Sequence, residues 1–346
     1  EIWDGIRSGP EGALADFGAA QSFSIDHIDE ILPKFLIGRS KIYYPFKDSD
    51  ETTQKVMGWI KISGQLAFDQ SSIKPELCDV KSFIDELRLV KSKAEISLMR
   101  TAAKITASAH LRAMRFCEPG KFEYQLQAEI EHEFALNGAR CPAYPSIVGG
   151  GKNGCILHYI ENSDVLTERD LVLIDAGCEF EHYAADVTRT FPVAGTFNPA
   201  QRSVYDVVLN AQKAAIKQIR PGSRWNRPHD AAVRIITKGL LELGLLKGTL
   251  NQLIKVEAYR DFYMHRTGHW LGLDVHDCGE YKVNGRWREF EPGMVLTVEP
   301  GIYIAPDKYK VSACWRGIAV RIEDDVLVTE DGCEVLTDNV PKEPDE

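Results

Sequence analysis

The sequence lacks the features that mark membrane, disulfide-rich and nucleic-acid-binding proteins. Its longest apolar runs, such as residues 171–174, fall far short of the roughly 18 residues that a membrane helix needs. Its eight cysteines are scattered and include no CxxC pair, so neither a disulfide scaffold nor a zinc ribbon is indicated. Basic residues are the minority, 41 against 51 acidic ones, and the net charge of −10 repels phosphate backbones. These absences exclude a membrane-spanning protein and argue against nucleic acid as a partner.

A secretory signal pattern is also absent, and the chain begins with Glu1 rather than Met, which indicates processing or a fragment. Unpaired, mostly buried thiols are typical of a reducing compartment, so we expect a cytoplasmic protein. What is present is an ordinary globular composition: 346 residues, of which 44% are hydrophobic and 27% charged. This length is sufficient for two domains.

The patterning changes near residue 88, where we place a domain boundary. Residues 1–88 are modestly patterned, with a loop expected at Asp48–Thr53 because charged and turn-forming residues cluster there. Beyond the boundary, apolar periodicity predicts helices at 94–116, 124–137, 199–219 and 229–243. Strands are predicted at 171–180, 183–193, 295–299 and 318–329. Helices mixed with a hairpin favour the α+β class for residues 89–346.

Two aspartates lie on the strands of the predicted hairpin. Asp175 ends the apolar segment LVLID, and Asp186 lies in the following strand. If the turn is centred between Phe180 and Glu181, the two carboxylates face each other directly across the hairpin. Like charges so placed repel each other unless a cation lies between them. The hairpin therefore predicts a cation site.

Three histidines and two glutamates complete a candidate metal set. His265, His269 and His276 fall within twelve positions, but Arg266 and Gly268 exclude a helical HExxH zinc site. Glu299 follows an apolar strand and precedes Pro300-Gly301, and Glu323 shares a strand face with Arg321. Oxygen-rich ligation with one imidazole suits Mn²⁺, Co²⁺ or Fe²⁺, and a pair of such ions needs shared carboxylates.

Six ordered segments of the chain resemble aminopeptidase P, the Xaa-Pro aminopeptidase of the pita-bread metallopeptidases. They are ILHYIEN, LIDAGCEF, ADVTRTFPV, HRTGHWLGLDVHD, PGMVLTVEPGIYI and RGIAVRIEDDVLVT. The resemblance extends from about Asp85 to the C-terminus and is weaker before it. It implies a pita-bread catalytic domain at residues 89–346, preceded by a partial N-terminal α/β domain at residues 1–88.

The resemblance also implies roles for individual residues. The ligands of two metal ions, usually Mn²⁺, are then Asp175, Asp186, His269, Glu299 and Glu323, of which Asp186 and Glu323 bridge the pair. A hydroxide between the ions attacks the carbonyl before proline, Glu299 relays a proton, and His276 stabilises the oxyanion. His265 and His158 match histidines around the substrate. Tyr303 and Arg321 match positions near the metals, where Tyr303 is expected to contact substrate and Arg321 to act in catalysis, although Arg321 could instead hold Glu323. Trp3 resembles a tryptophan that reaches a neighbouring subunit's active site.

The implied activity is metal-dependent release of the N-terminal residue from peptides with proline in second position, by a homo-dimer or homo-tetramer. Prolidase, which cleaves Xaa-Pro dipeptides, shares the fold and the ligands and stays open as an alternative. A non-catalytic binding protein on the same fold is a further alternative, although such proteins typically lose ligands. Methionine aminopeptidase fits less well because it lacks an N-terminal domain of this kind, and creatinase-like enzymes because they have lost the metal carboxylates.

Overall fold

The computed structural model describes residues 2–3, 5–46, 50–67 and 75–345. The chain divides into two compact units, residues 1–84 and 85–346. The first unit contains helices α1 (Gly9–Asp16) and α2 (Ile28–Leu36) and two parallel strands, β1 (Lys41–Tyr44) and β2 (Glu76–Asp79). Helix α3 (Asp50–Leu66) connects the two strands, as a parallel pair requires.

The loop expected at Asp48–Thr53 is wrong for its described part. Residues 47–49 lie outside the described residues, and residues 50–53 form the first turn of α3. Glu51, one of the charged residues that suggested a loop, is exposed on this helix and forms an ion pair of 3.0 Å with Lys55 one turn further on.

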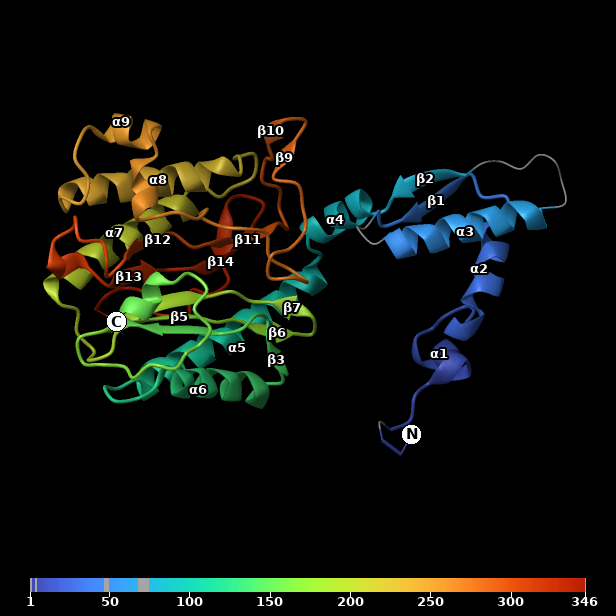
Figure 1. The fold of residues 1–346 in the computed structure, drawn as a ribbon, viewed down its shortest axis with the longest axis horizontal. Coiled ribbons are helices and arrows are strands. Elements are labelled where there is room, and N and C mark those ends of the chain that lie inside the picture. Colours follow the sequence, from blue (N-terminus) through green and yellow to red (C-terminus); the bar gives the residue numbers. More distant parts are fainter. Residues whose placement is uncertain (1, 4, 47–49, 68–74, 346) are drawn as a thin grey trace. The chain divides into compact units, whose positions relative to one another are not determined.

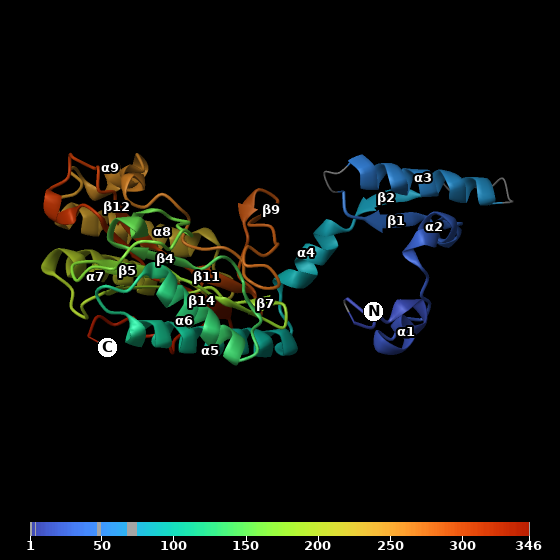
Figure 2. The same ribbon diagram turned by 60° about the horizontal axis from the view of Figure 1, so that its bottom comes forward.

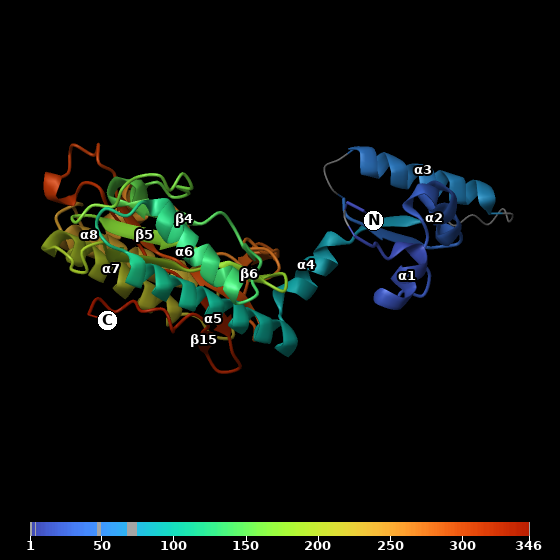
Figure 3. The same cartoon turned by 90° about the horizontal axis from the view of Figure 1, so that it is seen from below.

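The second unit places helices on both faces of a central layer of strands (Figures 1 and 3). Helix α4 (Lys81–Leu89) leads into it. Helices α5 (Lys93–Phe116) and α6 (Glu123–Leu136) cover one face, and α7 (Pro199–Ile216) and α8 (Asn226–Glu242) cover the other, with the short α9 (Leu250–Lys255) beside α8. Figure 2 shows the same layers from an intermediate angle. Mixed helices and antiparallel strands confirm the predicted α+β class.

Local sequence signals explain where the predicted helices begin. Ser92 and Glu95 form a reciprocal capping box at the start of α5, with the Ser92 N–H donating to Glu95 Oε2 at 2.6 Å. Asn198 and Gln201 do the same for α7, whose first residue is Pro199. All four predicted helices are present, with ends that differ from the expected ones by three residues or fewer.

The central strands include two three-stranded sheets. One sheet has the order β4 (Ile147–Gly150), β5 (Leu171–Asp175) and β8 (Thr188–Pro192). The other has β11 (Val295–Val298), β14 (Asp324–Val328) and β15 (Cys333–Val335). A further hairpin pairs β12 (Gly301–Ile304) with β13 (Ile318–Arg321). Smaller strands are β3 (Cys141–Pro142), β6 (Cys178–Phe180), β7 (Tyr183–Ala184), β9 (Lys282–Val283) and β10 (Arg286–Trp287).

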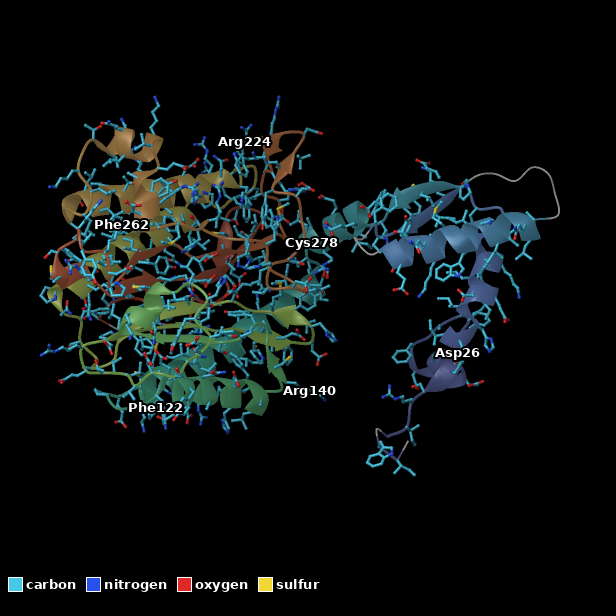
Figure 4. All side chains as sticks on the ribbon, in the orientation of Figure 1. Asp26, Phe122, Arg140, Arg224, Phe262 and Cys278 are labelled. Atoms are coloured by element: carbon cyan, nitrogen blue, oxygen red, sulfur yellow. The ribbon has the colours of Figure 1, made fainter. Side chains whose placement is uncertain are left out.

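Separate apolar clusters hold these layers together. One joins α7 and α8 to strands β11–β14, and includes Val208, Ile236 and Val326, each fully buried. Another joins α5 and α6 to β4 and β5 through Leu126 and Ile174. Figure 4 shows the side chains between the layers; Phe122 and Arg140 bracket α6, and Phe262 lies in the opposite helical layer. The strands between the two clusters are therefore fixed from both faces.

The predicted turn centre of the first hairpin is wrong by one residue, which shifts the pairing of the two strands by two residues. Its turn is centred on Glu181 and His182, which both have positive φ, so Asp175 pairs with Thr188 rather than with Asp186. Two left-handed residues make a turn of the kind that matches strand twist, but Glu-His carries none of the Asn-Gly signal that would reveal it. Asp186 is the diagonal neighbour of Asp175 on the same face, so the two aspartates still converge.

The second hairpin brings the two glutamates together. Strand β11 pairs with β14 and β12 with β13 in one continuous register, which sets Glu299 opposite Glu323 at the break between the two pairs. The strand predicted at 318–329 is thus divided at Glu323. Glu299 and Glu323 lie outside the paired strands at this point, and both carboxylates face the first hairpin across the cavity.

The structure also tests two further expectations, that the thiols are mostly buried and that no helix spans a membrane. All eight cysteines are free, but only Cys178 is fully buried, and Cys141 and Cys314 are exposed, which corrects the expectation of mostly buried thiols. Among the described residues, no helix combines the length and the apolar character needed to cross a membrane.

Gly177 tests whether the break in the first hairpin depends on the absence of a side chain. A Cβ at this position would lie 1.7 Å from the Ala185 carbonyl oxygen. We expect Gly177→Ala to lower the free energy of unfolding by about 3 kcal/mol, measured by urea titration, because the backbone must shift. Gly332→Ala is the control, since open space surrounds its Cβ, and it should change stability by less than about 0.5 kcal/mol. Equal stabilities would contradict this account.

Candidate metal centre and active site

One cavity of about 540 Å³ in the second unit gathers most of the predicted site residues. Its wall holds all five predicted ligands and four of the predicted catalytic side chains: Asp175, Asp186, His269, Glu299, Glu323, His158, His265, His276 and Arg321. The two remaining predicted residues lie elsewhere. Tyr303 is buried in contact with two wall residues, and Trp3 belongs to the first unit, where it is 93% exposed.

Asp175 and Asp186 share one hydrogen-bond donor, the buried hydroxyl of Tyr144. Tyr144 Oη lies 2.7 Å from Asp175 Oδ1 and 2.6 Å from Asp186 Oδ1. The second oxygen of Asp175 accepts a charge-assisted bond of 2.6 Å from Arg321 Nη2. The sequence could have indicated Tyr144 only by its place before Pro145 in a loop, which carries no specific signal.

Glu323 is held by the residue opposite Asp175 in the first hairpin. Thr188 Oγ1 donates to Glu323 Oε2 at 2.5 Å and accepts from Arg321 Nε at 3.0 Å. The alternative that Arg321 pairs with Glu323 is therefore corrected: its guanidinium bonds Asp175 directly and reaches Glu323 only through Thr188. The reason is that β13 runs beside the end of β5, so the Arg321 side chain meets Asp175 first.

His269 faces the carboxylates with one ring nitrogen and the backbone with the other. Its Nε2 lies 3.4 Å from Asp186 Oδ2 and 3.9 Å from Glu299 Oε1. Its Nδ1 lies 3.0 Å from the Trp270 carbonyl oxygen, an acceptor that keeps the proton on Nδ1. Nε2 is therefore the nitrogen that would bind a metal once its proton is lost. This backbone partner could not be identified from sequence.

A single guanidinium fixes the backbone behind the ligands. Arg189, 1% exposed, donates to the carbonyl oxygens of Thr188 at 2.9 Å and of Glu323 at 2.6 Å. It also bonds Asp324 Oδ1 at 2.7 Å and the Val340 carbonyl oxygen at 2.9 Å. The segment after β15 thus takes part in positioning Glu323. Sequence reasoning missed this network because its members are far apart along the chain.

Burial and mutual repulsion disturb the protonation of this cluster. Burial raises the pKa of the Glu299 carboxyl to about 7, and burial together with Asp186, Glu299 and Asp175 raises the pKa of Glu323 well above its ordinary value. Burial lowers the pKa of His269, but the Asp186 and Glu299 carboxylates and the Trp270 carbonyl oxygen together outweigh burial and raise that pKa to about 9. The carboxylates of Asp186 and Asp175 thus make Glu299 and Glu323 harder to ionise.

The remaining predicted side chains surround the carboxylates. His265 Nε2 lies 2.8 Å from Tyr303 Oη, which also accepts from Arg321 Nη1 at 2.9 Å. Burial lowers the pKa of His265 to about 3, so its ring is neutral. His276 packs its ring edge to face against His269, with centroids 4.4 Å apart, and His158 and His276 are exposed on the cavity wall.

These residues fit a divalent metal. Ligand atoms of Asp186, His269 and Glu323 lie within 4.8 Å of one another. A phenol has one proton, so the two short contacts of Tyr144 with carboxylates need either a further proton or a cation. Four carboxylate ligands and one imidazole nitrogen form a donor set that suits a hard or borderline dication. A dication would also relieve the repulsion that raises the carboxyl pKa values.

Comparison with known proteins agrees with this site. The profile of metallopeptidase family M24 matches residues 97–330, and that of the aminopeptidase P N-terminal domain matches residues 1–43. An Xaa-Pro aminopeptidase of Haemophilus influenzae is 46% identical over 99% of this chain and 77% of its own length. One from Escherichia coli is also 46% identical, over the whole of this chain and 78% of its own.

Solved structures show the same likeness. Aminopeptidase PepP of Pseudomonas aeruginosa has a TM-score of 0.96 and 52% identity, covering all of this chain and 78% of that one. Zinc-substituted aminopeptidase P of Escherichia coli with product has a TM-score of 0.94 and 46% identity, with the same coverage.

The chain belongs to metallopeptidase family M24, and the structure is its pita-bread fold. The predicted resemblance to aminopeptidase P and the predicted fold are thus confirmed, as is the prediction of a metal-dependent peptidase that uses divalent ions.

Metal binding can be measured without any substrate. We expect Mn²⁺ or Co²⁺ at a hundredfold excess over Kd to add about 2.7 kcal/mol to the stability of chelator-treated protein, seen as a higher unfolding temperature. Asp186→Asn should abolish this stabilisation because it removes a ligand charge from the cluster. The exposed Asp307→Asn should retain it. A full metal response in Asp186→Asn would show that the ions bind elsewhere.

Proposed function

We propose that this chain is an Xaa-Pro aminopeptidase: it removes the N-terminal residue from peptides that have proline in second position. The observation that carries the proposal is the convergence of Asp175, Asp186, His269, Glu299 and Glu323 on one cavity whose wall also holds three histidines. The named activity of relatives 46% identical over nearly the whole chain supports the same substrate class. An intact ligand set argues against a non-catalytic binding protein.

We assign the five proposed ligands to two divalent ions, and we expect both ions to be Mn²⁺. Asp186 and Glu323 would be shared by the two ions, Asp175 would bind one ion, and His269 and Glu299 would bind the other. When bound, such ions make hydroxide available near neutral pH by lowering the pKa of water. His269 must lose its Nε2 proton, and the carboxyls theirs, for ligation to occur.

The side chains around the ligands have distinct proposed roles. Glu299 accepts a proton from the attacking water and returns it to the leaving nitrogen. His276 donates a hydrogen bond to the carbonyl oxygen as negative charge develops there. His158 and His265 contact the substrate peptide from the cavity wall, and the neutral His265 ring adds no positive charge.

Tyr303 and Arg321 are proposed as positioning residues. The Tyr303 hydroxyl is engaged by Arg321 and His265, and only 3% of the residue is exposed, which argues against the substrate contact expected from sequence. Arg321 neutralises Asp175 from behind and orients Thr188 toward Glu323. Together they hold the acidic cluster in one geometry.

The remaining expectations stay proposals. Residues 1–88 would form the N-terminal domain and 89–346 the catalytic one. The protein would act as a homo-dimer or homo-tetramer, in which the exposed Trp3 reaches a neighbouring subunit. Eight unpaired cysteines support a reducing, cytoplasmic setting.

The substrate class can be tested with matched peptides. With Mn²⁺ present, we expect release of the first residue from Xaa-Pro-Yaa-Yaa, and rates at least a hundredfold lower on Xaa-Ala-Yaa-Yaa. An Xaa-Pro dipeptide serves as the comparison, with products followed by chromatography. Cleavage of the dipeptide alone would identify a prolidase instead, and no cleavage by a metal-loaded protein would support the binding-protein alternative.

His276 separates oxyanion stabilisation from metal binding. We expect His276→Ala to lower kcat by about 10²–10³-fold, because a hydrogen bond made mainly in the transition state is lost. The rise in unfolding temperature on adding Mn²⁺ should stay as in the unmodified protein, because His276 is not a proposed ligand. His132→Ala, an exposed histidine on α6, should leave kcat unchanged. An unaltered kcat in His276→Ala would remove this residue from the mechanism.

A further inference from the structure

A long connection forms one wall of the active-site cavity. Strands β4 and β5 are antiparallel neighbours, yet residues 151–170 separate them, and their only regular element is the 3₁₀ turn η2 (Gly151–Cys155). Leu157, His158 and Ile160 from this connection line the cavity. Long loops without regular structure are uncommon in compact domains and are usually functional. Such a wall needs contacts that fix its backbone.

The connection is fixed by one buried carboxylate on the neighbouring helix. Glu123, the first residue of α6, is completely buried. Its Oε1 accepts from the Gly150 N–H at 2.7 Å and from Asn153 Nδ2 at 3.0 Å. Its Oε2 accepts from Tyr159 Oη at 2.8 Å and from the Asp164 N–H at 2.9 Å. All four donors belong to residues 150–164, so a single side chain ties both ends of this segment together.

The hydrogen bond from Tyr159 to Glu123 affects the wall of the cavity. His158 and Ile160, on either side of it, are exposed on the cavity wall, whereas Tyr159 is buried and points the other way. Residues 157 and 158 form a turn, and Tyr159, between two exposed neighbours, is held by Glu123 on its buried side. Holding Tyr159 from behind therefore sets the direction in which His158 and Ile160 face the cavity. Tyr159 also packs with Tyr303, the partner of His265 and Arg321.

A second anchor closes the other end of the same stretch. Asn162 has a positive φ of 46° and is 1% exposed. Its Oδ1 accepts from the Val148 N–H at 2.9 Å, and its Nδ2 donates to the Ser146 carbonyl oxygen at 2.8 Å. Residues 157–160 are thus held by Glu123 through Tyr159 and by the contacts of Asn162 with residues 146 and 148. Neither anchor touches a proposed metal ligand.

We propose that Glu123 is a positioning residue for substrate binding: it presents His158, and with it Leu157 and Ile160, to the peptide without taking part in metal binding. This inference rests on the proposed function, since it assigns the loop to the same peptide site. Its effect should therefore fall on KM, because the wall contacts substrate and the ligands stay in place.

Glu123→Gln is the sharpest test, because the amide keeps the size of the side chain but replaces one acceptor oxygen with a donor. Two of the four donors then face an N–H₂ group. We expect KM for an Xaa-Pro-Yaa-Yaa peptide to rise about tenfold, with kcat lowered less than threefold and the Mn²⁺-induced shift in unfolding temperature unchanged. Glu129→Gln on the same helix, which loses only an ion pair with Arg112, should leave KM unchanged.

A double-mutant cycle with His158→Ala distinguishes positioning from a general structural role. If Glu123 acts through His158, the increase in KM of Glu123→Gln/His158→Ala will be smaller than the product of the two single increases. Independent, multiplicative effects would overturn the inference, as would a Glu123→Gln protein of lower stability but unaltered KM. Should Glu123→Gln not fold, Tyr159→Phe decides: a raised KM supports the inference and an unaltered KM overturns it. An unmodified protein that cleaves no Xaa-Pro peptide would instead refute the proposed function.

Discussion

The repulsion among buried carboxylates is the constraint on which the active site depends. Asp175, Asp186, Glu299 and Glu323 share one cavity, and removing such charges from water is costly unless cations or donors compensate. Arg321 and the Tyr144 hydroxyl supply part of that compensation, and divalent ions supply the rest. An arrangement that repels itself cannot hold its own shape. The surrounding fold has to impose it, and two hairpins packed between helical layers do so.

The imposed geometry comes largely from backbone contacts outside the cavity. Arg189 ties the carbonyl oxygens beside Glu323 and Thr188 to the segment that contains Val340, and buried Asp324 holds Arg189 in turn. Burial of an arginine is tolerable because each of its donors has an acceptor. On the opposite side, Glu123 organises the loop that bears His158. The proposed metal ligands and the loop that bears His158 are thus held by separate hydrogen-bond networks.

Sequence was sufficient to select the residues that gather in one cavity but not to predict their spatial relations. Helix starts such as Ser92 and Asn198 were predictable because capping is local, and the set of ligand residues was recognisable from ordered motifs. The hairpin register was not predictable, because Glu181 and His182 adopt positive φ without the Asn-Gly signal that marks such a turn. Tyr144, Thr188 and Glu123 escaped notice for a related reason: their importance lies in contacts across 27 to 135 positions, and a single sequence does not reveal such pairs.

The separation between the Arg189 and Glu123 networks also explains why the motifs of the proposed ligands do not by themselves define the substrate. Ligands at the ends of paired strands are held rigidly, and the chemistry of peptide hydrolysis requires nothing different of them for a dipeptide or a longer peptide. Discrimination has to come from side chains that meet the rest of the peptide. In this cavity the exposed candidates include His158 and Ile160, on a loop tied down by side-chain contacts rather than by a sheet. Changes at Glu123 or Tyr159 could therefore alter substrate choice while leaving the metal centre intact.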